Sequence, residues 1–521
     1  MILITSGAYA CSELQAEVGR LPPAFLPLAN RRLYEHQVEA LRARFPHLPI
    51  ALSLPDGFVP AAADQARLDA LGVTRVPVPE GLRLGESVLC AINAIGRYDG
   101  SLRILHGDTL IRQCPLFEDV VALADTHDDY AWEVETDTAC AERVWCGYFA
   151  FGDTKLLARC LSLARGDFVA AVRAYQASRP QQAELVDDWL DLGHVSTYFR
   201  SRAAITTQRA FNSLQIAGGV VRKSSGQAAK MAAEAAWYAA LPPALKPLAP
   251  QLVEAGEAEG ARFYALEYLP CMPLNELYVH GRLAPAFWTR IFKLARGLLE
   301  RLAAAGPAAT EAAAREAVQA DFEALVLHKT RSRLAAFAAA ADIDLDAPTA
   351  FAGRGLPSLR RIAEDCQQRS LALPPRPGWL HGDLCFSNLL YDSRTAALKM
   401  IDPRGLDAHD RPATRGDLRY DAAKLLHSVL GGYDHVLAGR CRLAVHGPLA
   451  FDLALHWDEP AEAVQAWVRA QFRPLGLPTA ALMPLVVLLF LSMLPLHQDQ
   501  PRRQQALLAN ALRLYAELET A

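Results

Sequence analysis

Residues 379–402 read W-L-H-G-D-L-C-F-S-N-L-L-Y-D-S-R-T-A-A-L-K-M-I-D, and this stretch decides how the remainder of the chain is interpreted. An apolar lead-in and a polar loop precede two short apolar runs, at residues 389–391 and 398–401. Asp392 and Ser393 stand between the runs and are typical turn residues. The pattern predicts a β-hairpin that carries acidic side chains at its mouth.

Three polar residues of this stretch, Asp383, Asn388 and Asp402, can converge on one point. Phosphoryl transfer needs such a trio, because one carboxylate accepts the hydroxyl proton while an amide and a second carboxylate hold the metal ions on the phosphates. The H-x-D-x-x-x-x-N spacing that begins at His381, followed by a strand-borne Asp, is the pattern of the protein-kinase catalytic loop. The alternative is that the acids only cap turns; the number of correctly spaced polar residues favours catalysis.

The stretch resembles the aminoglycoside phosphotransferase and choline kinase family, with Gly382 in place of the protein-kinase Arg and D-P-R-G from Asp402 in place of D-F-G. The resemblance implies a two-lobed, kinase-like α+β fold that phosphorylates small molecules. Asp383 is then the base, and His381 holds the loop by hydrogen bonding. Asn388 and Asp402 are the magnesium ligands. No A-P-E pattern follows, so a protein kinase or a scaffold is a weaker interpretation.

The composition is that of a globular protein with more than one domain. A chain of 521 residues exceeds one ordinary domain, and 52% hydrophobic with 21% charged residues is typical of folded cores. The net charge of −4 with mixed signs gives no basic face, so nucleic acid is not an expected partner. The ten cysteines show no C-x-x-C pair, which favours reduced thiols in a cytoplasmic protein.

Two further features concern export and membranes. The N-terminus has no basic segment before its first apolar run, so no signal peptide is predicted. The most apolar run, residues 483–496, contains Pro484 and Pro495 and is too short to span a bilayer. We therefore expect a buried helix and no membrane span.

The first 205 residues alternate strand-like and helix-like segments. Strands are predicted at residues 2–5, 50–54, 75–79 and 102–106, and helices at residues 33–44 and 86–95. This rhythm predicts an α/β, Rossmann-like domain with a mostly parallel sheet. Ligands of such sheets bind at the carboxyl ends of the strands, where Ser6, Gly7, Gly107 and Asp108 stand.

This region resembles the sugar nucleotidyltransferases, whose fold is GT-A-like. Four of their motifs have counterparts in the same order: S-G-A-Y at residues 6–9, P-A-F-L-P at 23–27, H-G-D at 106–108 and W-L-D-L-G at 189–193. The resemblance implies that Ser6 and Gly7 bind a nucleotide and that Asp108 and Asp191 hold magnesium against it. The alternative for each acid alone is a strand-end cap.

Departures from these motifs bear on the activity of the front domain. Tyr9 and Cys11 replace a glycine and an arginine of the family's loop, and Ala24 replaces the lysine of P-K-x-L-x-P. A cation there would stabilise charge on the transferring phosphate, an effect commonly worth ~2.7–4 kcal/mol. Arg20 is near in sequence and is a candidate substitute. The domain is either an altered nucleotidyltransferase or a nucleotide-binding module.

The kinase-like half begins near residue 206. Two strands are predicted around Gly218 and Gly219, and alternation along the second places Val221 and Lys223 on one face. A predicted helix at residues 227–241 follows and carries Glu234. Their order before the catalytic loop indicates that Lys223 clamps the ATP phosphates and that Glu234 tethers it. The alternative is that Glu234 only pairs with Lys230, one helical turn away.

The same family resemblance implies further positions in this half. A predicted strand at residues 263–269 leads into the hinge between the lobes, where Glu267 and Leu269 would receive the adenine. Asp417 and Asp421 resemble the acid that braces the catalytic loop from the following helix. Residues 284–366 and 435–521 are predicted to be helical.

These observations predict a nucleotidyltransferase-like domain at residues 1–205, a kinase-like N-lobe at 206–272 and a helical C-lobe at 273–521. The predicted protein is a bifunctional cytoplasmic enzyme. Its kinase would phosphorylate a sugar or amino alcohol with ATP and Mg²⁺, and its front domain would join the product to a second nucleoside triphosphate, such as CTP or UTP. The resemblance implies bacterial capsule and surface-polysaccharide biosynthesis. The alternative is a small-molecule kinase whose front domain binds nucleotide without catalysis.

Overall fold

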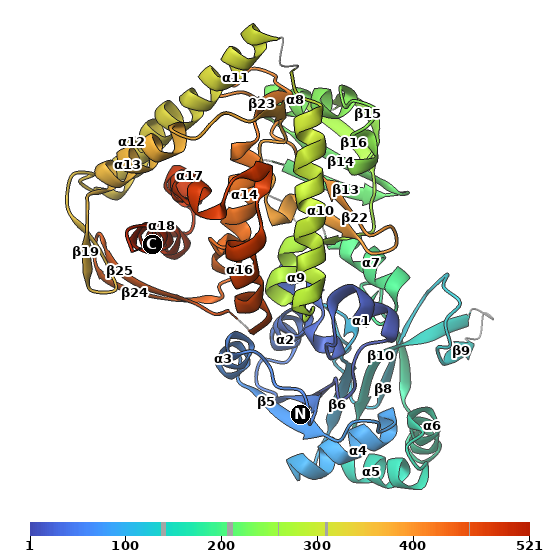
Figure 1. Cartoon of the computed structure of the whole chain (residues 1–521). Helices are drawn as coiled ribbons and strands as arrows, with labels where there is room; N and C mark the ends of the chain where they lie inside the picture. Colours follow the sequence, from blue (N-terminus) through green and yellow to red (C-terminus); the bar gives the residue numbers. More distant parts are fainter. Residues whose placement is uncertain (137–141, 206–211, 259, 308–310, 458, 521) are drawn as a thin grey trace. The chain divides into compact units, whose positions relative to one another are not determined.

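The structure, a computed structural model, describes residues 1–136, 142–205, 212–258, 260–307, 311–457 and 459–520 (Figure 1). The chain divides into two compact units. The first comprises Met1–Ile205 with His280–Arg282, and the second comprises Thr206–Val279 with Leu283–Ala521.

The first unit is built on an eight-stranded sheet in the order β11-β8-β10-β6-β1-β4-β5, with β9 paired to β10. The strands are β1 (Ile2–Thr5), β2 (Pro27–Leu28), β3 (Arg31–Arg32), β4 (Ile50–Pro55), β5 (Val73–Val78), β6 (Leu102–His106), β7 (Thr109–Leu110), β8 (Val120–Ala124), β9 (Val134–Thr136), β10 (Glu142–Phe151), β11 (Gln182–Leu185) and β12 (Leu190–Asp191). The helices are α1 (Ser12–Val18), α2 (Leu33–Arg44), α3 (Ala62–Ala70), α4 (Leu84–Ile95), α5 (Thr154–Leu163), α6 (Phe168–Ser178) and α7 (Val195–Ala204).

The centre of this sheet is parallel and buried. β1 pairs in parallel with both β4 and β6, and all four of its residues are buried. Alternate strand residues such as Leu3, Ile104 and Phe149 share a core with residues of α4, α5 and α6, which lie together in Figure 1. Apolar runs of this kind form where helices cover a parallel sheet. The predicted α/β fold class is confirmed, and α2 begins and ends where the sequence predicts.

The second unit begins with a four-stranded antiparallel sheet in the order β13-β14-β16-β15. Its elements are β13 (Asn212–Ala217), β14 (Val220–Ser225), α8 (Ala228–Ala239), β15 (Leu252–Ala258) and β16 (Ala261–Glu267). Gly218 and Gly219 join the first two strands with φ of +56° and +76°. Such values suit a two-residue hairpin turn that glycine adopts without steric cost, so the two glycines form a turn as expected.

The rest of the second unit is mainly helical, and α10 is its long helix in Figure 1. The helices are α9 (Leu274–His280), α10 (Pro285–Ala304), α11 (Ala312–Ala324), a π-helical turn (Leu325–Lys329), α12 (Thr330–Ala341), α13 (Leu359–Leu371), α14 (Arg419–Val429), α15 (Tyr433–Leu437), α16 (Glu459–Gln471), α17 (Thr479–Met493) and α18 (Pro501–Leu518). The strands are β17 (Met272–Pro273), β18 (Thr349–Phe351), β19 (Arg354–Leu356), β20 (Pro377–Trp379), β21 (Leu389–Asp392), β22 (Ala397–Met400), β23 (Arg415–Asp417), β24 (Cys441–Gly447) and β25 (Ala450–Leu455).

Two stretches predicted to be helical contain strands instead. β18 and β19 interrupt residues 284–366, β24 and β25 interrupt residues 435–521, and the four form one sheet in the order β19-β18-β25-β24. β18 pairs in parallel with β25, with Ala350 opposite Ala450. The prediction was wrong because pairing between segments so distant in the chain outweighs local helical spacing.

The apolar run near the C-terminus belongs to a longer helical stretch than expected. Among the described residues, Thr479–His497 is long and apolar enough to cross a membrane by length and composition. Pro484 lies inside α17 and Pro495 in the turn that follows it, so neither proline ends the stretch early. The estimate that it is too short was therefore wrong, but 78% of its most apolar window is buried inside the structure, as predicted for a core helix.

Candidate active site

The predicted β-hairpin is present as β21 and β22, with Leu389 opposite Met400, and the polar loop before it is tightly built. Gly382 has a φ of +80°, a conformation that favours glycine. A Cβ atom added to Gly382 would lie 2.8 Å from the Cβ of Arg404. Both the backbone conformation and the close approach of Arg404 therefore explain glycine beside the candidate base.

His381 holds the loop from within, as the family resemblance implies. Its Nδ1 accepts a hydrogen bond from the backbone N–H of Asp383 (3.2 Å), and its Nε2 lies 2.9 Å from the carbonyl oxygen of Ile401. This pair of contacts places the proton on Nε2, which donates to the carbonyl. Burial lowers the pKa of His381 to about 4, so the ring stays neutral at physiological pH.

Of the two candidate bracing acids, Asp421 takes that position and Asp417 does not. The carboxylate of Asp421 accepts the backbone N–H groups of His381 (2.9 Å) and Gly382 (2.8 Å). Asp417 is paired instead with the buried guanidinium of Arg419 at 2.7 Å. Asp421 therefore fixes the loop backbone directly, while Asp417 neutralises a buried cation of the same helix region.

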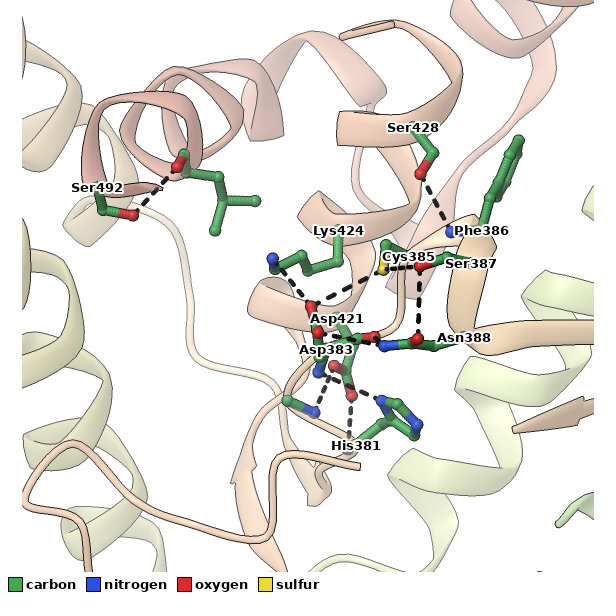
Figure 2. A network of polar contacts seen from close by, with 12 residues as sticks. His381, Asp383, Cys385, Phe386, Ser387, Asn388, Asp421, Lys424, Ser428 and Ser492 are labelled. Carbon is green, nitrogen blue, oxygen red and sulfur yellow. Dashed lines mark hydrogen bonds and ion pairs between the residues drawn. The ribbon is translucent and has the colours of Figure 1, made fainter. Parts of the chain in front are cut away.

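Asp383 is 42% exposed and pairs with Lys424 of α14 at 2.9 Å (Figure 2). Burial of the loop opposes ionisation of Asp383, but the Lys424 ammonium outweighs it and lowers the pKa of the carboxyl to about 2. The side-chain amide of Asn388 also donates to the Asp383 carboxylate (3.1 Å). Sequence reasoning missed Lys424, because no motif marks it and its helix follows the catalytic loop by about forty residues.

The candidate metal ligands Asn388 and Asp402 both lie beside this loop. Asp402 is 48% exposed and has a φ of +54°. Its backbone N–H donates a hydrogen bond to the hydroxyl oxygen of Tyr238 (3.0 Å). Strained residues of this kind cluster at functional sites. An amide oxygen and a carboxylate are hard oxygen donors of the type that Mg²⁺ takes. The two residues therefore fit magnesium chemically.

Lys223 makes the contact that the sequence predicts. Its Nζ lies 2.7 Å from Glu234 Oε2 and 3.1 Å from Asp402 Oδ1. Lys230, the alternative partner, is 3.7 Å from Glu234 and is far more exposed. The hydroxyl of Tyr264 also donates to Glu234 (2.7 Å). The structure therefore joins the clamp lysine, its tether and a candidate metal ligand in one set of contacts.

The predicted hinge residues follow the end of β16. Glu267 is the last residue of the strand and is exposed, and its backbone N–H donates to Gln251 (2.9 Å). Leu269 lies two residues beyond and accepts the backbone N–H of Cys271 (2.8 Å). Both residues thus lie in the segment that connects the sheet to the helices of the second unit, and their contact with adenine stays a prediction.

In the first unit, Asp108 and Asp191 are brought together at the pairing of β7 with β12. A Cβ atom added to Gly193 would lie 2.6 Å from Asp108 Oδ2 and 3.4 Å from Asp191 Oδ1. Burial, and next the charge of Asp191, raise the pKa of Asp108 to about 6. Two facing carboxylates repel each other unless a proton or a cation lies between them, so this pair fits a divalent cation.

Aromatic side chains surround the carboxylate pair, and the sequence analysis missed them. His194 Nδ1 contacts Asp191 at 2.9 Å, and Tyr130 stacks on the His194 ring at 3.8 Å between centroids. Trp132 packs edge-on against His194 and against Trp189. The indole next to the W-x-D-x-G acid was the one signal in the sequence.

The predicted nucleotide loop of the first unit is closely packed. Ser6 Oγ accepts the backbone N–H of Ala24 (3.0 Å), and a Cβ atom on Gly7 would lie 2.4 Å from a Val78 methyl group. Ala24 is fully buried. Arg20 lies over the Tyr9 ring, 3.8 Å from its centroid, and pairs with Glu80 at 2.7 Å. A cation therefore stands at the loop, already matched by a carboxylate.

Neither candidate metal site contains many protein ligands. Among the described residues, no group of three or more His, Cys, Asp and Glu side chains is placed to hold a metal ion. Mg²⁺ commonly binds through one or two carboxylates and completes its shell with waters and substrate phosphates. Two ligands at each site are therefore compatible with magnesium that arrives with a nucleotide.

Part of the second unit matches a known family. Residues 213–439 match the model of the phosphotransferase enzyme family. No curated protein matches the chain significantly.

Solved structures resemble each half. The nucleoside-diphosphate-sugar pyrophosphorylase from Vibrio cholerae RC9 is 15% identical and covers 39% of this chain and 99% of its own, with a TM-score of 0.33. HddC from Yersinia pseudotuberculosis is 14% identical, covers 39% and 99%, and has a TM-score of 0.31. A thermostable mutant of aminoglycoside phosphotransferase APH(4)-Ia, in ternary complex with ADP and hygromycin B, is 15% identical, covers 60% and 92%, and has a TM-score of 0.34. The predicted kinase-like half contains the residues that the phosphotransferase model matches.

Proposed function

We propose that the second unit transfers the γ-phosphoryl group of ATP to a hydroxyl of a small-molecule acceptor. The observation that carries this proposal is the position of Lys223, whose Nζ contacts both Glu234 (2.7 Å) and Asp402 (3.1 Å). A phosphate clamp and a candidate metal acid thus belong to one set of contacts. Asp383, with a carboxylate 42% exposed, is available to a hydroxyl at the same loop.

Different residues at the catalytic loop have different roles in the proposed reaction. Asp383 orients the acceptor hydroxyl and accepts its proton, and Asn388 holds that carboxylate in place through its amide (3.1 Å). His381 and Asp421 keep the loop backbone fixed, so the base does not have to reorganise when substrate binds. Mg²⁺, when bound at Asn388 and Asp402, would neutralise charge on the ATP phosphates.

We propose that the first unit joins the phosphorylated acceptor to a second nucleoside triphosphate, such as CTP or UTP, and releases pyrophosphate. The facing carboxylates of Asp108 and Asp191 support this proposal, because triphosphate needs a divalent cation at the point of attack. The product would be a nucleotide-activated sugar or alcohol. Such compounds are cytoplasmic precursors of bacterial surface polysaccharides, which is the setting that we propose.

A second candidate function makes the first unit a nucleotide-binding module without catalysis. The observations that favour it are the buried Ala24, which offers no cation, and the Arg20 guanidinium, which already pairs with Glu80 (2.7 Å). Under this alternative the kinase activity is unchanged and no pyrophosphate is released.

The test is a two-stage screen with the full-length chain. Sugars and amino alcohols are first incubated with ATP and Mg²⁺ while ADP is measured, and each phosphorylated product is then incubated with the common nucleoside triphosphates while pyrophosphate is measured. We expect acceptor-dependent ADP and then product-dependent pyrophosphate. Nucleotide binding without pyrophosphate would establish the binding-module alternative, and acceptor-independent ADP formation throughout would contradict the kinase proposal.

A further inference from the structure

Four cationic side chains of the second unit lie near enough for three of them to act on the charge of the fourth, Lys329: they are Lys329, Arg333, Arg404 and Lys424, here called the cation cluster. Lys329 ends the π-helical turn and Arg333 follows on α12. Arg404 comes two residues after the candidate metal ligand Asp402, and Lys424 lies on α14. Turns of π-helix are rare and are frequent at functional sites, so the cluster is not an ordinary charged surface.

Hydrogen bonds hold the members of the cluster near the loop. The backbone N–H of Arg404 donates to His381 (2.8 Å), and its guanidinium Nη2 donates to the carbonyl of Asp407 (2.6 Å). The backbone N–H of Ala408 donates to Asp321 Oδ1 (2.6 Å) on α11, close before the π-helical turn. The segment after Asp402 therefore connects the catalytic loop to the helix that carries Lys329.

Arg333 and the helix that carries Lys424 both contact helix α17. The guanidinium of Arg333 donates to the carbonyl of Ser492 (3.0 Å) on α17, and α14, which carries Lys424, packs against the same helix. Lys424 reaches the loop itself, 2.9 Å from Asp383 (Figure 2). The four cations thus come from elements that share α17 or the catalytic loop as a neighbour.

Two of these cations have nitrogen atoms that are left without a partner. Within the residues that the structure describes, the Lys329 amine makes no hydrogen bond or ion pair, and Arg404 Nη1 is buried without a hydrogen-bond partner. Burial, and next the charges of Arg404 and Arg333, lower the pKa of Lys329 to about 7. The four residues are half-buried, and cations that lose part of their water are costly unless an anion compensates them. Nearby acids are engaged elsewhere or exposed: Asp321 accepts the Ala408 N–H, Asp407 pairs with Arg411, and Asp410 is exposed.

We propose that the cation cluster binds an anionic group, a carboxylate or a phosphate, carried by the acceptor whose hydroxyl meets Asp383. The inference rests on the kinase function proposed above and names its acceptor class: an acidic sugar or a phosphorylated alcohol. The ATP phosphates have their own clamp in Lys223, which contacts Asp402 (3.1 Å). An amino alcohol is disfavoured, because its ammonium group would face the like charges of Lys329, Arg333 and Arg404, while Lys424 is already paired with Asp383.

A first experiment needs no knowledge of the acceptor. Reductive methylation of lysines is measured by mass spectrometry on the full-length chain, with a non-hydrolysable ATP analogue and Mg²⁺ saturating the nucleotide site. Inorganic phosphate and malonate are the anionic probes, and glycerol and choline are the neutral and cationic ones. We expect the anions to slow labelling of Lys329 about tenfold at ten times their Kd. Lys293, exposed on α10, is the internal control and keeps its rate.

The outcomes separate two sources of the anion. Protection of Lys329 by phosphate or malonate in the presence of the ATP analogue supports the proposal. Protection that disappears once the analogue is bound assigns the cluster to the nucleotide phosphates and overturns it. Equal protection of Lys329 and Lys293, or protection by choline, also overturns it.

A second experiment tests the acceptor class by activity. Matched acceptors that differ in one charge, such as glucuronate and glucose or glycerol 3-phosphate and glycerol, are compared with choline. We expect the anionic member to be preferred and Lys329→Met to raise its KM about tenfold while the KM for ATP is unchanged. Lys329→Arg, which keeps the charge, should restore the KM. Preference for choline overturns the inference and leaves the kinase standing, whereas full activity of Asp383→Asn contradicts the kinase itself.

Discussion

In the second unit, the acids at the candidate active site each lie against a lysine, whereas in the first unit two carboxylates face each other. Asp383 pairs with Lys424 at 2.9 Å and Asp402 with Lys223 at 3.1 Å. Asp108 and Asp191 lie against no lysine or arginine in the ion pairs found among the described residues, and the His194 ring lies 2.9 Å from Asp191. In the second unit the negative charges of Asp383 and Asp402 are therefore compensated before substrate arrives, whereas the facing carboxylates of the first unit leave a place for a cation.

The difference has consequences for what each site requires. Paired acids keep a fixed geometry without ligand, which suits a base that must stay ionised and aimed at a hydroxyl. Facing carboxylates cost stability in the absence of metal and recover it when a divalent cation binds. Removing a single carboxylate should therefore leave an unpaired lysine in the second unit and relieve a repulsion in the first unit.

The largest effect is expected at the kinase base. Asp383→Asn should lower the rate of phosphoryl transfer about 10²–10⁴-fold, because general-base catalysis contributes that much, and should leave ATP binding nearly unchanged. Rates and ATP affinity are measured separately. Asp392→Asn is the matched control in the same hairpin, since Asp392 only caps the turn through the N–H groups of Arg394 and Thr395. Equal losses in the two variants would mean that Asp383 is also a turn cap.

The front carboxylates should show the opposite balance of activity and stability. Asp108→Asn should abolish pyrophosphate release and leave the kinase reaction intact, because a metal ligand is lost. Asp188→Asn is the control, since the Asp188 carboxylate accepts the backbone N–H groups of Arg112 and Gln113 (2.9 Å each) and is not one of the proposed metal ligands. Mg²⁺ with nucleoside triphosphate should raise the unfolding midpoint of the wild-type first unit and not that of Asp108→Asn.

The pH dependence of this pair has a definite sign. The pKa of Asp108 is raised to about 6 in the folded chain. The stability that protonated Asp108 contributes to the folded chain is therefore fully present below the unfolded pKa of about 3.9 and is lost as pH rises through about 6. Without metal, Asp108→Asn should therefore be the more stable protein at pH 8, by about 1–2 kcal/mol, and not at pH 4. Equal stability differences at both pH values would show that the carboxylates do not interact.

Local spacing explains why much of the kinase site could be predicted from sequence. His381, Asp383 and Asn388 lie in one loop, so their types and spacing fix their mutual positions. Lys223 and Glu234 were predicted from their order before that loop, and the structure places them 2.7 Å apart. The fold class followed in the same way from the alternation of short apolar strands and amphipathic helices.

The missed features depend on contacts between distant segments. Lys424 contacts Asp383 from helix α14, far along the chain from the catalytic loop. Asp417, predicted as a possible brace of that loop, pairs with Arg419 instead. The parallel pairing of β18 with β25 likewise joins segments about a hundred residues apart, with Ala350 opposite Ala450. No local periodicity encodes such contacts, because they arise only when the helices between them have packed.

A smaller effect should decide what replaces the missing lysine at Ala24. If Arg20 supplies charge to the transferring phosphate, Arg20→Met should lower pyrophosphate release about tenfold, less than the loss for a buried donor because Arg20 is 59% exposed. Glu80→Gln is the matched variant: it frees the guanidinium and should keep or raise the rate. Kinase activity is the internal control. Unchanged release in Arg20→Met would leave the loop without a catalytic cation and favour the binding-module alternative.

The smallest effect concerns the positive charges of the cation cluster in the second unit, which repel one another as the two carboxylates of the first unit do. Burial, and next the charges of Arg404 and Arg333, lower the pKa of Lys329 to about 7. Between about pH 7 and 10 the unfolded chain then binds a proton that the folded chain does not, so the stability of the wild type rises with pH over this window. Lys329→Met should be more stable than wild type below pH 7, by about 1–2 kcal/mol after allowance for solvent screening, and should lose this advantage toward pH 10.

Calorimetry of the full-length chain at pH 6 and pH 9.5 measures this difference as a shift in the unfolding midpoint of the second unit. Lys293→Met, at an exposed position of α10, is the control and should shift little at either pH. Inorganic phosphate should narrow the gap between wild type and Lys329→Met at pH 6, because an anion bound by the cation cluster stabilises only the charged amine. If the gap is the same at both pH values, Lys329 is not held among uncompensated cations. In that case only the first unit, with Asp108 and Asp191, would contain like charges that a bound counter-ion stabilises.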